Sequence, residues 1–62
     1  MSQHGDRLTR LGEAVRAIEA ARTTRDELIR EALAVGERVV DICTITGLSR
    51  SRVYQIRDGV RA

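Results

Sequence analysis

The chain has 62 residues and a formal net charge of +2, so it is long enough for one small domain. A domain of this size buries only about 60% of its unfolded surface and often gains stability from a partner chain. It contains one Tyr and no Pro, Trp or Phe, which argues against an aromatic-rich β-sandwich or barrel. Ala, Leu, Arg and Glu dominate and favour helices, so the expected fold class is all-α.

The charge is unevenly distributed. Residues 1–36 hold six Arg and six acidic residues, whereas residues 37–62 hold five Arg against three acidic residues. The excess of positive charge therefore lies in the C-terminal part, as expected of a nucleic-acid binder and equally of a solvated charged surface. All basic side chains are Arg, which points to a bacterial source of high GC content.

Several functions lack the residues they require. The single cysteine, Cys43, excludes an internal disulfide and a multi-cysteine zinc site, and His4 is the one histidine. No paired carboxylates, Cys–His couple or phosphate loop can be assembled, so we expect neither an enzyme nor a cofactor. The thin core predicts no small-molecule ligand. Without an apolar run of about 18 residues or a leader pattern, we expect no membrane span and a cytoplasmic, nucleoid-associated protein.

A helical pattern begins at Asp6, after polar residues 1–5 that we expect to be disordered. Four aliphatic residues then follow a 3-4-3 spacing, which places them on one stripe of a helix: Leu8, Leu11, Val15 and Ile18. The stripe either folds back onto the rest of the chain or pairs with a second copy. We favour a homodimer formed through these four residues, with residues 1–24 as the dimerisation segment.

This helix either ends near residue 24 or continues beyond it. Thr24 followed by Glu27 is a capping-box pattern that would start a new helix. Thr costs only a few tenths of a kcal/mol inside a helix, however, so we favour one continuous or gently kinked helix over residues 6–35. Its second apolar stripe, expected to face the C-terminal unit, is formed by Leu28, Ile29, Ala32, Leu33 and Val35.

The remaining elements are short. Gly36 is placed to end the first helix in a left-handed cap, and a helix over residues 38–46 follows. Gly47 supplies a turn, and Ser49 is expected to cap a helix over residues 49–58 by accepting from the amide of Ser51 or Arg52. Gly59 would end this helix, leaving residues 60–62 as a tail.

Residues 39–58 read V-V-D-I-C-T-I-T-G-L-S-R-S-R-V-Y-Q-I-R-D. With its apolar anchors and turn glycine, the segment over residues 25–58 resembles the three-helix DNA-binding units of serine recombinases and sigma-factor region 4. Small bacterial regulators share the phrase at residues 47–54. Cys43 and Thr46 depart from the pattern, which usually has Ala and an apolar residue there. Either Ile45 fills the space of Thr46 or the helix is slightly rotated.

The resemblance implies that residues 25–62 form a helix-turn-helix domain that binds double-stranded DNA, with its last helix in the major groove. Base reading would then fall to Arg50, Ser51 and Gln55, since Arg suits guanine and Gln suits adenine. Phosphate contacts would come from Arg38, Thr44, Ser49, Arg52, Tyr54 and Arg57. The alternative role for Tyr54 is half-buried packing.

We therefore expect a sequence-specific DNA-binding homodimer that acts as a transcriptional repressor or a plasmid or phage regulator. In such a dimer two recognition helices about 34 Å apart would read successive turns of one duplex face. Two alternatives stay open. One is a protein-interaction module of the transcription machinery, such as a sigma-like or accessory factor, and the other is the DNA-binding piece of a recombinase or small terminase.

Overall fold

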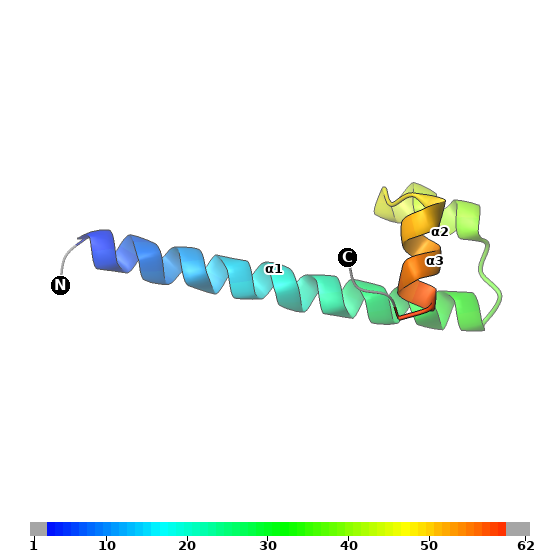
Figure 1. The fold of residues 1–62 in the computed structure, drawn as a ribbon, viewed down its shortest axis with the longest axis horizontal. Helices are drawn as coiled ribbons and strands as arrows, with labels where there is room; N and C mark the ends of the chain where they lie inside the picture. The colour runs from blue at the N-terminus through cyan, green and yellow to red at the C-terminus, as the bar shows by residue number, and fades with distance from the viewer. Residues whose placement is uncertain (1–2, 60–62) are drawn as a thin grey trace.

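The computed structural model describes residues 3–59, which contain three helices and no strand. α1 spans Gln3–Ala34, α2 spans Val39–Thr46 and α3 spans Arg50–Arg57. α1 is a long rod, and α2 and α3 pack against its C-terminal half to form a head (Figure 1). The molecule measures 52 × 20 × 18 Å. The all-α prediction is confirmed, with a long N-terminal helix followed by two short ones.

α1 continues without a break through the two threonines that might have divided it. The Thr23 hydroxyl donates to the carbonyl oxygen of Glu19 at 3.1 Å, a bond to the preceding turn that is typical of a helix interior. The expectation of a continuous helix is confirmed, and a new helix capped at Thr24 is wrong. α1 begins at Gln3 rather than at Asp6; residues 1–2 and 60–62 lie outside the described range.

Gly36 ends α1 as predicted. Its φ is +91°, a left-handed conformation that strains any residue with a Cβ atom. The Glu37 amide donates to the carbonyl of Ala32 at 2.9 Å and the Gly36 amide to that of Leu33 at 3.1 Å. This pair of bonds is the Schellman motif, and it turns the chain back toward α1.

A small core joins the three helices. Its buried members are Ile29 of α1, Ile42 of α2, and Val53 and Ile56 of α3. Around them pack the partly buried side chains of Ala32, Leu33, Val39, Cys43 and Leu48. Cys43 thus serves as a small, partly buried residue at the edge of the core.

Two members of the predicted second stripe do not join this core. Leu28 and Val35 are exposed, so the prediction is wrong for them, whereas it holds for Ile29, Ala32 and Leu33. Successive residues of an α-helix are about 100° apart, which places Leu28 on the flank of α1 when Ile29 faces the core. Val35 follows the last helical residue, where the chain already turns.

The turn between α2 and α3 is held by a threonine side chain. Gly47 adopts a left-handed conformation with φ of 74° at the C-terminus of α2. The Thr46 hydroxyl donates to the Ile42 carbonyl at 2.7 Å and accepts from the Leu48 amide at 3.2 Å. These bonds give the polar side chain of Thr46 a structural role at the turn. Ile45 is 86% exposed, so it does not fill the space of Thr46.

We expect Thr46→Val to lower the free energy of unfolding by about 1 kcal/mol, because the half-buried Leu48 amide loses its acceptor while the side-chain shape is kept. For a domain of this size this corresponds to a fall in Tm of roughly 4–8 °C, measured by circular dichroism. Thr44→Val is the matched control, since that hydroxyl is exposed and bonds only within its own helix. An equal or higher Tm for Thr46→Val would contradict the role assigned to this side chain.

Candidate nucleic-acid interface

α3 is fixed to the head along one side. Val53 and Ile56 are 0% and 1% exposed and lie three residues apart, so they share one face of the helix. The other faces of α3 therefore lie at the surface. The exposed side chains on them are Arg50, Ser51, Tyr54, Gln55 and Arg57, and that of Arg52 is half-buried.

The N-terminus of α3 has the predicted cap. The Ser49 hydroxyl accepts a hydrogen bond from the Arg52 amide at 3.1 Å, which satisfies one of the amides that a helix leaves free at its start. The Ser49 hydroxyl keeps its own proton for donation. The partial positive charge of the helix end lies beside exposed Arg50 and Ser51, an arrangement that favours an anion at this end of α3.

The arginines of α3 differ in how they are held. No hydrogen bond or ion pair within residues 3–59 engages the guanidinium of Arg50. The Arg52 Nη1 atom lies 3.4 Å from Oε1 of Gln55, a long and weak hydrogen bond on the helix surface. Of the predicted base-reading residues, Arg50 is therefore the most available, whereas Gln55 has a neighbour that it must release or share.

Arg57, in contrast to Arg50, is held by an acidic neighbour. Its Nε atom donates to Oδ1 of Asp58 at 2.9 Å, and this hydrogen bond lowers the pKa of Asp58 and raises the pKa of Arg57. Both groups therefore stay charged at neutral pH and largely offset each other. The Arg57 guanidinium also lies 5.0 Å from the centre of the Tyr54 ring, within the range of a cation–π contact. Tyr54 is 39% exposed, which fits the half-buried alternative as well as a contact at the surface.

One residue that matters for the position of α3 was missed by sequence reasoning. The Arg30 Nε atom donates to the carbonyl of Ile56 at 3.0 Å, linking α1 to the last turn of α3. The same carbonyl also accepts from the Gly59 amide at 3.1 Å, so Arg30 adds a charged donor to a carbonyl at the C-terminus of α3. The two residues are 26 positions apart, and nothing in the local sequence around Arg30 signals the contact.

Three predicted phosphate contacts lie outside α3: Ser49 is its N-cap, and the other two belong to α2 and its N-cap. Arg38 occupies the N-cap position, with φ of −79° and ψ of 136°, and its side chain makes no capping hydrogen bond. Thr44 is exposed and its hydroxyl donates to the Val40 carbonyl at 2.9 Å. Arg38 and Thr44 are six positions apart, which is more than one helical turn, so they would contact a duplex separately from the compact group on α3.

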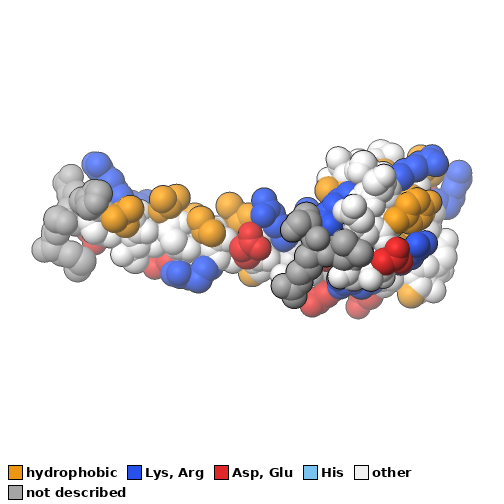
Figure 2. Space-filling model, in the orientation of Figure 1, with side chains coloured by type: hydrophobic (Ala, Val, Ile, Leu, Met, Phe, Trp, Pro, Cys, Tyr) orange, Lys and Arg blue, Asp and Glu red, His pale blue; other side chains and the backbone are white. Residues whose placement is uncertain are grey.

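The four predicted dimerisation residues lie on the free half of α1, which is the N-terminal half that does not pack against the head. Leu8, Leu11, Val15 and Ile18 are between 50% and 61% exposed. Figure 2 shows hydrophobic side chains spaced along this half of the rod, away from the head. The segment does not fold back onto α2 or α3, which removes one of the two readings of the stripe.

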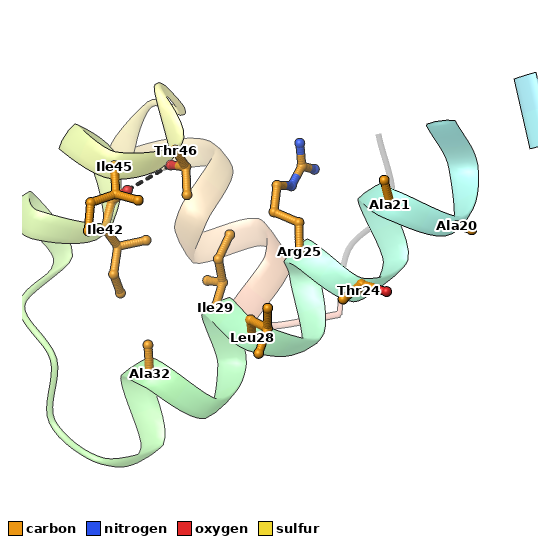
Figure 3. Close-up of a pocket in the computed structure, with 10 residues that line it drawn as sticks. All are labelled: Ala20, Ala21, Thr24, Arg25, Leu28, Ile29, Ala32, Ile42, Ile45 and Thr46. Atoms are coloured by element: carbon orange, nitrogen blue, oxygen red, sulfur yellow. Dashed lines mark hydrogen bonds between the residues drawn. The ribbon is translucent and has the colours of Figure 1, made fainter. Parts of the chain in front are cut away.

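A second apolar surface was not foreseen. A groove of about 640 Å³ lies between α1 and α2 and is lined mainly by hydrocarbon (Figure 3). Its large aliphatic side chains are those of Ile29 and Ile42, which are buried, and of Leu28 and Ile45, which are exposed; Arg25 also lines the groove. Within residues 3–59 there is no group of His, Cys, Asp or Glu that could hold a metal ion.

Comparison of the chain with protein-family models, with curated proteins and with solved structures found no match. Among the described helices, none combines the length and apolar character needed to cross a bilayer.

We expect Arg30→Met to lower the free energy of unfolding by about 1 kcal/mol, because the Ile56 carbonyl loses a charged donor while the length of the side chain is nearly kept. Urea unfolding gives the stability, and hydrogen exchange should show faster opening of the last turn of α3. Arg16→Met is the matched control on the exposed side of α1. Equal stability of the two variants would show that the Arg30 bond does not hold α3.

Proposed function

We propose that the chain is a sequence-specific DNA-binding protein whose α3 enters the major groove of a duplex. The observation that carries this proposal is the division of α3 between a buried side, formed by Val53 and Ile56, and an exposed side bearing Arg50, Ser51 and Gln55. In this proposal α2, the turn at Gly47 and α3 form a helix-turn-helix, and the C-terminal half of α1 is the bracing helix.

The exposed side chains suit base edges. The guanidinium of Arg50 can donate two hydrogen bonds to O6 and N7 of guanine, and the amide of Gln55 can pair with adenine. Each such pair is worth about 1–3 kcal/mol of discrimination against a wrong base. An α-helix with its side chains is about 10–12 Å across, which matches a major groove about 12 Å wide. The Ser51 hydroxyl would add a shorter contact near the start of the helix.

The surrounding groups suit phosphates. Arg38, Arg52 and the amide end of α3 carry positive charge, and the first turn of α3 contains no acidic residue, whereas Arg57 is paired with Asp58. Such contacts fix the position of the protein on the duplex and make its affinity depend on salt. We propose that the protein acts by occupying its site as a homodimer, in the manner of a repressor or a plasmid or phage regulator.

Fluorescence anisotropy tests the base-reading role of Arg50. On a duplex selected from a random pool, we expect Arg50→Ala to weaken binding by roughly 10- to 100-fold, because a bidentate base contact is lost. Binding to unrelated duplexes should fall much less. Arg10→Ala is the matched control, since Arg10 lies on the free half of α1.

Two outcomes would count against the proposal. Equal binding by Arg50→Ala and the unaltered protein would contradict the assignment of the base-reading side chain. No duplex binding at any salt concentration, with the helices intact by circular dichroism, would instead favour a protein-interaction module.

Arg38→Ser separates stability from DNA binding. A serine at the N-cap of α2 supplies the missing cap, so we expect the free energy of unfolding to rise by about 0.5–1 kcal/mol. The affinity for DNA should fall, and the slope of log affinity against log salt should become shallower by about one unit. An unchanged salt slope would show that Arg38 does not contact a phosphate.

A further inference from the structure

We propose that the stripe formed by Leu8, Leu11, Val15 and Ile18 binds the same stripe of a second copy, with the two α1 helices running in opposite directions. The proposal rests on the homodimer of the proposed function and adds its geometry. It is tested without DNA, so it can fail or hold independently of DNA binding.

The stripe is complementary to its own reversed copy. Its 3-4-3 spacing reads the same in both directions, so an antiparallel partner presents its side chains at matching heights. Leu8 then lies opposite Ile18 of the second copy, and Leu11 lies opposite Val15 of the second copy. Each pair covers two aliphatic side chains that are at least half exposed in the single chain.

The position of the head on α1 favours an antiparallel pair. Leu11 and Ile29 are 18 residues apart, which is five full turns at 3.6 residues per turn, so they lie on one side of α1. Ile29 carries α2 and α3 on that side. In a parallel pair both heads would have to occupy the space between the helices. The head lies at the C-terminal end of the rod (Figure 1), so an antiparallel pair would place the two heads at opposite ends.

The charged residues next to the stripe also favour an antiparallel pair. A parallel pair in register would bring Arg22 and Arg25, the next two positions of the heptad, against the same arginines of the second copy. In an antiparallel pair centred on residue 13 the stripe ends before these positions. The charged residues at its margins, Arg7 and Glu19, then face small residues of the second copy rather than like charges.

Gly12 has no explanation within the single chain. A Cβ atom built there would meet Arg16 Nη1 at 3.7 Å, an ordinary contact, so space does not require glycine. The residue is helical, where glycine is less favourable than alanine. In the antiparallel pair Gly12 and Ala14 lie beside the twofold axis, where small residues allow the two backbones to approach closely.

The arrangement sets the distance between the heads. With the pair centred on residue 13, Ile29 lies 16 residues from the centre in each copy, so the two head anchors are roughly 50 Å apart at 1.5 Å per residue. This exceeds the 34 Å of one DNA turn. If the proposed function holds, the two heads are therefore too far apart to read half-sites that are a single turn apart.

Charge substitution at Gly12 tests the direction, with self-association measured by sedimentation equilibrium. In an antiparallel pair Gly12 lies next to Gly12 of the second copy. We expect Gly12→Glu and Gly12→Lys each to raise the dimer dissociation constant by at least roughly two- to fivefold, and an equimolar mixture to associate more tightly than either variant alone. Both substitutions favour the helix, so circular dichroism should show no loss of α1.

In a parallel pair Gly12 would instead lie near Arg7 of the second copy, so stronger self-association of Gly12→Glu would overturn the proposed direction. An unaltered protein that is monomeric at all concentrations would overturn the pairing itself.

Disulfide formation tests the register in a Cys43→Ala background. We expect Leu8→Cys and Ile18→Cys to form a mixed covalent dimer when combined, because these positions face each other. Each variant alone should remain uncrosslinked, since identical positions are roughly 15 Å apart along the pair. Efficient crosslinking of Leu8→Cys with itself would indicate a parallel pair and contradict the proposal.

Discussion

The head depends on the mutual burial of four aliphatic side chains. Ile29, Ile42, Val53 and Ile56 come from all three helices, and each contributes on the order of 2 kcal/mol by leaving water. Their sum is comparable to the whole stability of a small domain. Neither α2 nor α3, with eight residues each, would be stable as an isolated helix, so both exist because this core holds them.

The same packing creates the candidate interface. Because Val53 and Ile56 turn one side of α3 inward, Gln55 lies on the outward side and Arg50 on the flank, and both are exposed. The polar contacts around the core then refine this position. Thr46 holds the turn before α3, Ser49 caps its start, and Arg30 binds its last turn. A core of four side chains leaves few spare contacts, so these hydrogen bonds at the ends of α3 matter more than they would in a larger domain.

The sequence alone was sufficient to predict the features of the fold that depend on residues close together in the chain. The continuous α1, the left-handed Gly36 and the Ser49 cap follow from propensity and from the chemistry of helix ends, and all three are confirmed. Features set by the crossing of helices were not foreseen. Whether Leu28 or Ile45 is buried depends on where α2 lies over α1, and the bond from Arg30 to α3 depends on the same crossing. The pairing of the stripe and the contacts to DNA remain predictions.

Because α1 is continuous, it connects the stripe rigidly to the head that carries α3. Between residues 13 and 35 there is no Gly or Pro, so the helix has no hinge between the stripe and the head. A second copy bound at the stripe therefore has a fixed position relative to α3. Each residue inserted between Ile18 and Arg25 would rotate the head by about 100° and move it by about 1.5 Å. In the proposed dimer the length of α1 determines both the spacing of the two recognition helices and the faces of the duplex that they meet.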